Sequence, residues 1–185
     1  SDKFSLYQLF TYMFMHSGFE HIFFNMFAVW MFGRILETVW GPQRFLFYYV
    51  LCGMGAGLVQ EVTQYIEFAP YMADMAQLST YASDAVIPIN GTTHTAAQWL
   101  TMYDRVISVP TVGASGAVYA ILMAFGMLFP NQELFIFPLP MPIKAKWLII
   151  GYFVIELGLG IMNNDGIAHF AHLGGMVFGF LLIVY

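Results

Sequence analysis

Long apolar stretches separated by polar links set the hydropathy pattern of this 185-residue chain. A helix that crosses the hydrocarbon core of a membrane, which is about 30 Å thick, needs about 20 mostly apolar residues. Five stretches of the chain meet this requirement. We therefore predict an all-α fold, a polytopic transmembrane helix bundle whose spans cover roughly residues 21–40, 45–66, 113–129, 145–162 and 166–185.

The shorter links fit a single bundle. Residues 41–44 and 163–165 form tight connections between consecutive spans. The link over 131–144 carries Pro138, Pro140 and Pro142, and proline interrupts a helix because it lacks an N–H donor and clashes with the preceding turn. The sequence shows no internal repeat, and we predict one membrane domain over residues 1–185.

The link over about 67–112 is longer, polar and rich in small residues. Asn90-Gly91 within it is typical of a turn. Apolar residues recur at helical spacing over 95–107, which favours a short amphipathic helix there. We therefore predict that 67–112 is a long loop inserted into the membrane domain. Loops of this length are usually functional or disordered.

Composition supports the membrane assignment. Hydrophobic residues make up 59% of the chain and charged residues 9%, whereas soluble domains average roughly 25% charged residues. This balance excludes a disordered chain and a water-soluble surface. The net charge of −5 argues against nucleic-acid binding, and the single cysteine excludes an internal disulfide framework.

The basic residues predict the orientation in the membrane, because cytoplasmic loops are enriched in Lys and Arg. Four of the six lie on or beside the 41–44 and 131–144 links, which we therefore place in the cytoplasm: Arg34, Arg44, Lys144 and Lys146. The N-terminal segment, the 67–112 loop and the 163–165 link then face the extracytoplasmic side. Such a hydrophobic bundle with one cysteine fits a bacterial inner membrane.

Polar residues inside spans are costly and are functional-site hypotheses by default. Ser115 begins the third stretch within Gly113-Ala114-Ser115-Gly116, where it could instead cap a helix. His172 lies in the fifth stretch, where it could be a hydrogen-bonded packing residue. Gly175 and Gly179 follow it at small-residue spacing, which favours close helix packing.

His21 and Asn25 form the third polar group, on one face of the first stretch, where they could be an interhelical clasp. All three groups lie near the extracytoplasmic ends of their spans. Together they supply a hydroxyl, an imidazole and hydrogen-bond donors, which are the parts of a serine hydrolase.

In these motifs the sequence resembles the rhomboid intramembrane serine proteases. The stretch from Gly113 to Gly116 is similar to the family's G-x-S-G motif, and His21-Ile-Phe-Phe-Asn25 to its H-x-x-x-N motif. Ala171-His172, with Gly175 and Gly179, is similar to its A-H-x-x-G-x-x-x-G motif. The resemblance covers nearly the whole chain except the 67–112 loop.

The resemblance implies a role for each residue. Ser115 would be the nucleophile and His172 its base, in a dyad without a carboxylate. His21, Asn25 and the Ser115 backbone N–H would form the oxyanion hole, and Tyr119 would pack under the His172 ring. The segment 1–20 would be a membrane-associated first loop, and the loop 162–166 would cap the site. No cofactor and no metal are implied.

The resemblance also implies membrane-protein substrates that are cleaved in or beside a transmembrane segment within the lipid bilayer. The family core has six spans, so we expect one further span before Ser1. The main alternative is a non-catalytic rhomboid-like protein that binds membrane clients. Members of that kind have usually lost the serine or the histidine, and both are present here.

Other readings fit less well. A transporter would place its polar groups near the midplane of the membrane, and an aspartyl protease would need two Asp residues inside spans. Glu156 lies inside the fourth stretch, where we predict a paired or protonated polar group. Asp165, His169 and His172 share a helical face, but we do not predict a metal site there.

Overall fold

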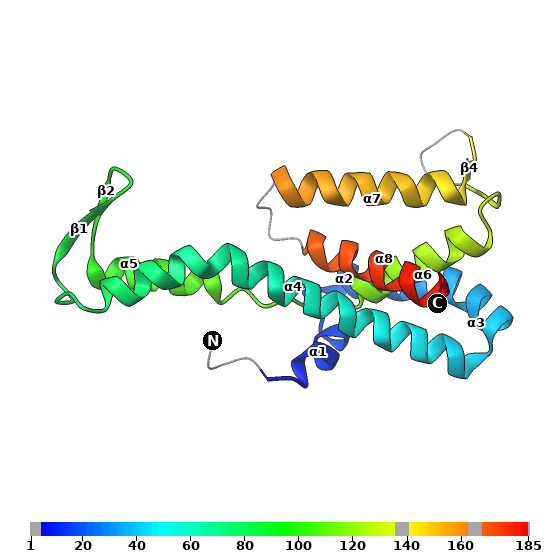
Figure 1. Cartoon of the computed structure of the whole chain (residues 1–185), viewed down its shortest axis with the longest axis horizontal. Helices are drawn as coiled ribbons and strands as arrows, with labels where there is room; N and C mark the ends of the chain where they lie inside the picture. Colours follow the sequence, from blue (N-terminus) through cyan, green and yellow to red (C-terminus); the bar gives the residue numbers. More distant parts are fainter. Residues whose placement is uncertain (1–4, 136–140, 163–167, 185) are drawn as a thin grey trace. The chain divides into compact units, whose positions relative to one another are not determined.

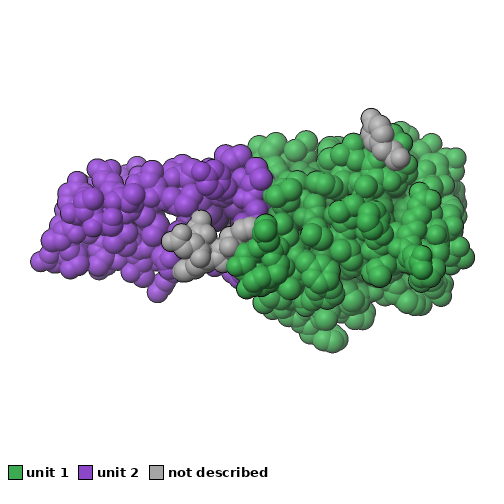
Figure 2. All heavy atoms as spheres, turned by 60° about the horizontal axis from the view of Figure 1, so that its bottom comes forward, with its two compact units in different colours: residues 1–60, 111–185 green, residues 61–110 purple. Residues whose placement is uncertain are grey.

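The computed structural model describes residues 5–135, 141–162 and 168–184 (Figure 1). The chain forms two compact units, which Figure 2 shows in different colours: residues 1–60 with 111–185, and residues 61–110. We call them unit 1 and unit 2. The described chain is mainly helical, and its helices are α1 (Gln8–Thr11), α2 (Phe19–Ala28), α3 (Arg34–Trp40), α4 (Pro42–Leu78), α5 (Ala96–Ile107), α6 (Ser115–Leu128), α7 (Ala145–Met162) and α8 (His169–Val184).

The predicted all-α membrane bundle is confirmed. Three helical segments of the described chain are long and apolar enough to cross a membrane: Phe19–Trp40, Pro42–Leu78 and Ala145–Met162. The first of these is continuous through α2 and α3 because a π-helical turn, η2 (Val29–Gly33), joins them. The other two predicted spans contain the shorter apolar helices α6 and α8, of 14 and 16 residues.

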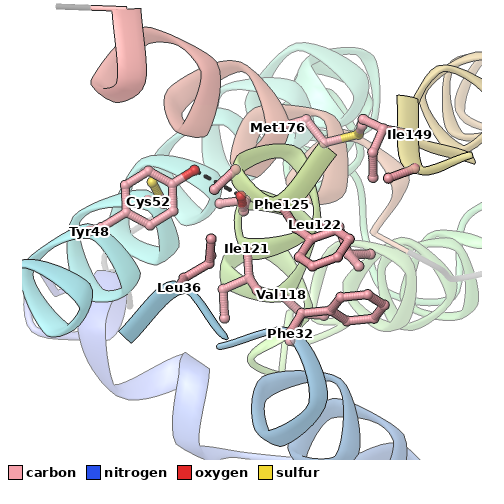
Figure 3. Close-up of a cluster of buried hydrophobic side chains, with 13 residues drawn as sticks. Phe32, Leu36, Tyr48, Cys52, Val118, Ile121, Leu122, Phe125, Ile149 and Met176 are labelled. Carbon is pink, nitrogen blue, oxygen red and sulfur yellow. Dashed lines mark hydrogen bonds between the residues drawn. The ribbon is translucent and has the colours of Figure 1, made fainter. Parts of the chain in front are cut away.

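Helix α6 is the most deeply buried helix of unit 1. Nine of its 14 residues are buried, and they are small or apolar side chains. Phe32 from η2 and Leu36 from α3 pack against it on one side, and Met176 from α8 on another (Figure 3). The Tyr48 hydroxyl of α4 donates a 2.8 Å hydrogen bond to the Ala120 carbonyl of α6. Helix α6 therefore has few positions that can accept a polar side chain without a partner.

Helices α6 and α8 approach each other closely, which confirms the predicted small-residue packing. A Cβ atom added to Gly175 would collide with the backbone of Gly116. One added to Gly179 would lie 3.1 Å from the Cα of Ala120. Because a Cβ at position 175 would force the backbones apart and one at position 179 would make a tight contact, these glycines allow the short distance between Ser115 on α6 and His172 on α8.

The N-terminal segment also contacts the bundle. After α1, a 3₁₀ turn, η1 (Tyr12–Phe14), buries Tyr12 and Met13 against Ala117. The Tyr12 hydroxyl donates a 2.7 Å hydrogen bond to the Gly53 carbonyl. Burial raises the pKa of Tyr12 above its usual range, so the phenol stays a neutral donor. Tyr12 and Met13 thus lie against the bundle, and the membrane association expected of the 1–20 segment stays a prediction.

The link over 131–144 contains no helix in its described part, as its prolines predict. Two short strands pair there, β3 (Glu133–Leu134) and β4 (Ile143–Lys144). Residues 136–140 lie outside the described chain.

Unit 2 corrects the prediction of a loop over 67–112. Helix α4 continues through Pro70 to Leu78, so the link starts 12 residues later than expected. The remainder forms a hairpin of β1 (Val86–Ile89) and β2 (Thr92–Thr95), followed by α5. Asn90 and Gly91 both have positive φ, which a type I′ hairpin turn requires, so this predicted turn is confirmed.

Helix α5 matches the predicted amphipathic helix to within one residue. Thr95 caps its N-terminus in a capping box with Gln98. Its buried side chains Trp99 and Tyr103 form a small core with Leu78. The apolar and small residues of the long link therefore build a unit with a core of its own.

Candidate active site

Ser115 and His172 face each other across the contact between α6 and α8. His172 Nε2 lies 2.9 Å from Ser115 Oγ, which is hydrogen-bonding distance. His172 is 9% exposed and Ser115 is half-buried. Ala114 holds the N-cap position of α6, and no side chain makes a capping hydrogen bond there. The alternative reading of Ser115 as a helix cap is therefore wrong.

Tyr119 supports the imidazole from one helical turn further along α6. Its ring stacks on the ring of His172, with centroids 4.3 Å apart and an angle of 13° between the planes. The predicted contact under the His172 ring is therefore present. Its hydroxyl donates a hydrogen bond to Glu156 Oε1 on α7. Tyr119 thus contacts both His172 and the carboxylate beside it.

Gly113 brings the backbone before α6 close to His21. Its φ is +118°, which an L side chain rarely adopts, and a Cβ atom there would lie 2.6 Å from His21 Nε2. The Gly113 N–H donates to the Tyr12 carbonyl at 3.0 Å, which fixes this turn against the N-terminal segment. Glycine is required here both for its backbone conformation and for the approach of the imidazole.

The contacts of His21 indicate which of its ring nitrogens carries the proton. Its Nδ1 accepts a 3.4 Å hydrogen bond from the Ser17 backbone N–H and lies 3.0 Å from the Ser17 hydroxyl. In a neutral imidazole only one nitrogen carries a proton. The proton therefore belongs to Nε2, the atom that faces Gly113, two residues before Ser115.

Asn25 lies one turn after His21 on the same helix. It is 6% exposed, and its side-chain amide donates a 2.8 Å hydrogen bond to the His21 carbonyl. One amide hydrogen is used in this bond, which leaves the second hydrogen and the oxygen for other partners. The predicted pair is thus linked along α2 rather than across two helices.

Glu156 is the site residue whose role the sequence did not reveal. It is 6% exposed on α7, and its Oε2 lies 3.0 Å from His172 Nδ1 and 2.6 Å from His169 Nδ1. The expectation of a paired polar group is confirmed. The sequence showed an acid inside an apolar span, which is a signal of a functional residue. Its partners could not be predicted, because they lie on other helices.

The same cluster is the group in the described chain that could hold a metal ion. One ligand atom from each of Glu156, His169 and His172 lies within 4.8 Å of the other two. The expected face of Asp165 with His169 and His172 cannot be compared, because residues 163–167 lie outside the described chain. For the same reason the expected cap over 162–166 is described only at Met162.

These features define a class of protein: an integral membrane helix bundle with a serine–histidine pair buried between two closely packed helices. The chain belongs to the rhomboid family, because the rhomboid domain matches residues 3–185. This family includes serine intramembrane proteases. No solved structure matches the chain.

Curated relatives support the family assignment. The chain is 27% identical to the yeast "Rhomboid protein 1, mitochondrial" (Saccharomyces cerevisiae) over 91% of its own length and 38% of that protein. It is 25% identical to "Rhomboid protease GluP" of Bacillus subtilis over 94% of the chain and 25% of that protein. It is 25% identical to "Rhomboid protease AarA" of Providencia stuartii over 93% of the chain and 53% of that protein. The chain thus spans between a quarter and about half of these relatives.

Proposed function

We propose that this protein is a serine endopeptidase that cleaves membrane-protein substrates in or beside a transmembrane segment. The observation that carries the proposal is the 2.9 Å contact between Ser115 Oγ and His172 Nε2 in a buried site. Two relatives are named as rhomboid proteases, which supports the same activity.

The reaction follows from this geometry. His172 Nε2 accepts the hydroxyl proton while Ser115 Oγ attacks the substrate carbonyl carbon. His172 then gives this proton to the leaving amine as the C–N bond breaks, which leaves an acyl-enzyme. A water molecule, activated by the same imidazole, hydrolyses the ester and restores the serine.

The developing oxyanion needs hydrogen-bond donors that are already in place. The Ser115 N–H lies at the first position of α6, where a helix offers it no acceptor of its own. His21 Nε2–H faces Gly113, two residues before Ser115. We propose that these two donors, with the Asn25 amide, form the oxyanion hole.

The length of α6 supports cleavage below the membrane surface. Its 14 residues rise about 21 Å at about 1.5 Å per residue, which is less than the hydrocarbon core of about 30 Å. A helix this short cannot reach both faces of the core. Ser115, at one end of α6, is therefore suited to a peptide bond near a membrane interface.

We propose substrates with a helix-breaking residue near the cleaved bond and a small residue before it. A helical peptide bond already has its hydrogen bonds satisfied within the helix, so the backbone must unwind before Ser115 can attack. Glycine or proline lowers the cost of unwinding. No cofactor takes part in this chemistry.

We propose that the site lies on the extracytoplasmic side, as the distribution of Lys and Arg predicts. The bacterial inner membrane stays a prediction, since the relatives include both mitochondrial and bacterial proteins.

The first test is labelling by a fluorophosphonate probe, which reacts with activated serines, in the protein reconstituted in lipid bilayers. We expect labelling of the natural chain, and its loss in both Ser115→Ala and His172→Ala. Ser83→Ala is the matched control, because Ser83 is exposed in unit 2. A substrate with one transmembrane segment then tests peptide cleavage.

Absence of labelling in the folded chain, and in a longer chain that includes an upstream span, would contradict the proposal. Retention of membrane clients by such an unlabelled protein would instead support the non-catalytic binding function. Labelling only in the longer chain would mean that the further span is needed to assemble the site.

A further inference from the structure

Glu156 is an acidic residue inside an apolar helix, where burying its charge is unfavourable in free energy. It is the single acid of α7 and is buried, on the face that packs against α6 and α8. A carboxylate in such a position needs strong partners, because an unpaired charge in an apolar interior is unstable. The partners of Glu156 show what the residue does.

Three donors meet at this carboxylate. Tyr119 donates its hydroxyl to Oε1, and both His169 Nδ1 and His172 Nδ1 lie within hydrogen-bonding distance of Oε2. An ionised carboxylate only accepts hydrogen bonds and can accept about four, so it satisfies all three neighbours at once. A protonated carboxyl would have to donate to one of them.

This arrangement fixes the tautomer of His172. If Nδ1 donates its proton to Glu156, the neutral ring has no proton on Nε2. Nε2 is the atom that lies 2.9 Å from Ser115 Oγ. The imidazole therefore presents its lone pair to the serine hydroxyl, as a general base must.

We propose that Glu156 is a positioning residue that completes a Ser115–His172–Glu156 triad, holding His172 in its basic tautomer and orientation. This inference rests on the proposed function, and it replaces the dyad without a carboxylate that the resemblance implies. The proton of Ser115 moves to Nε2 during attack, while the Nδ1 proton stays on His172. The carboxylate stabilises the resulting imidazolium through that hydrogen bond.

Tyr119 and His169 complete the support. Tyr119 stacks on the His172 ring and also donates to Glu156, so it fixes the two groups relative to each other. His169 lies one turn before His172 on α8, and its Nδ1 lies 2.6 Å from the same oxygen, where an Nδ1–H can donate to an ionised carboxylate. The carboxylate is thereby held by α6 and α8 although it comes from α7.

A metal ion would use the same atoms for the opposite purpose. It would need the Nδ1 lone pairs of His169 and His172, which would leave the proton of a neutral His172 on Nε2. His172 could not then accept the proton of Ser115. The hydrogen bond from Tyr119 to the carboxylate and the contact of His172 Nε2 with Ser115 favour the triad.

The test compares the natural chain with Glu156→Gln and Glu156→Asp in lipid bilayers. Gln keeps the size of the side chain but removes the charge, and Asp keeps the charge on a shorter arm. We expect Glu156→Gln to lower kcat and the rate of fluorophosphonate labelling by up to about 10⁴-fold, which is the loss that follows when the orienting Asp of a serine protease triad is replaced by Asn. KM should stay within about threefold, and Glu156→Asp should recover part of kcat.

Glu61→Gln is the matched control, since it makes the same substitution at a half-buried glutamate of α4. Thermal unfolding of each variant separates a positioning role from loss of the fold. A Glu156→Gln protein that unfolds like the natural chain and keeps its kcat would overturn the proposal. Loss of activity of the natural chain on treatment with EDTA would also overturn it in favour of a metal site.

A second measurement needs no variant. In ¹⁵N-histidine-labelled protein, solid-state NMR should show His172 protonated at Nδ1 and unprotonated at Nε2, with the resonance assigned by comparison with His172→Ala. The opposite tautomer would overturn the proposal. If Ser115 is never labelled but the expected tautomer is found, the proposed function fails while the hydrogen bond to Glu156 stands.

Discussion

At the residue scale, the site consists of side chains whose partners are each defined. Ser115 contacts one nitrogen of His172 and Glu156 contacts the other. Tyr119 covers a face of the same ring. An imidazole held at both nitrogens and on one face has little freedom to rotate away from the serine. This restriction is the structural basis of the activity that we propose.

Tyr119 allows the ring contact and the hydrogen bond to be separated. Tyr119→Phe keeps the stacking on His172 and removes the donor to Glu156, so we expect labelling of Ser115 to slow by less than about tenfold. Tyr119→Ala removes both and opens a cavity, which costs about 3–5 kcal/mol for a large aromatic residue. Labelling rates and thermal unfolding of both variants would measure this difference.

Tyr152→Phe is the control for the tyrosine variants, because Tyr152 packs edge-on against Tyr119 with centroids 5.9 Å apart. It should label like the natural chain. Equal effects of Tyr119→Phe and Tyr119→Ala would show that stacking on His172 contributes nothing to the rate.

At the scale of elements, the distance between α6 and α8 decides whether the serine meets the histidine. The two helices carry Ser115 and His172, and they touch where Gly116 lies against Gly175. Helix α7 then adds Glu156 from a third direction. The glycines thus affect the geometry of the candidate site although they carry no side chain.

Gly175→Ala should abolish labelling of Ser115. The new Cβ would collide with the Gly116 backbone, and neither partner can move away without separating the two helices. We expect at least a hundredfold slower labelling, together with a lower thermal unfolding midpoint.

Gly151→Ala on α7 is the matched control, because a Cβ there meets nothing within 4 Å. Alanine in place of glycine in a helix interior stabilises by roughly 0.5–1 kcal/mol, so this variant should label normally and unfold no earlier. A Gly175→Ala protein that labels at the natural rate would contradict the assigned role of helix packing.

At the scale of the whole molecule, the chain divides its residues between two compact units. Every residue of the candidate site lies in unit 1. Unit 2 has a core of its own around Leu78, Trp99 and Tyr103. Two separate cores predict that damage to one leaves the other able to fold.

Trp99→Ala tests this separation. Trp99 is 6% exposed, and its indole N–H donates a 2.9 Å hydrogen bond to the Ile87 carbonyl. Its truncation should destabilise unit 2 by about 3–5 kcal/mol, which hydrogen exchange over 86–107 would detect. Ser115 should still be labelled within about threefold of the natural rate. A complete loss of labelling would show that the site depends on unit 2.

The sequence by itself determined the elements and the types of residue in the site. Hydropathy predicted the apolar helices because burial in lipid demands long uninterrupted runs. Thr95 with Gln98 and Asn90 with Gly91 are local signals, and the structure has a helix start and a turn at those positions. The motifs also picked out Ser115 and His172, because polar residues are rare inside such spans.

The composition of the chain was less informative after Ile66, where a polar segment is helical in the structure. The polar and small residues after Ile66 predicted a loop, but α4 continues to Leu78 with Pro70 inside it. Helix formation depends on packing as well as on composition, and the last turns of α4 contribute Leu78 to the core of unit 2.

Only the tertiary structure decided how the site is completed. Periodicity relates residues on one helix, and it carries no information on which face of α7 meets α8. Glu156 was visible in the sequence as an acid in an apolar span, but its 3.0 Å contact with His172 Nδ1 joins residues 16 positions apart on different helices. Helix packing, set by glycines that let two backbones touch, brought the hydroxyl, the imidazole and the carboxylate into one line of hydrogen bonds.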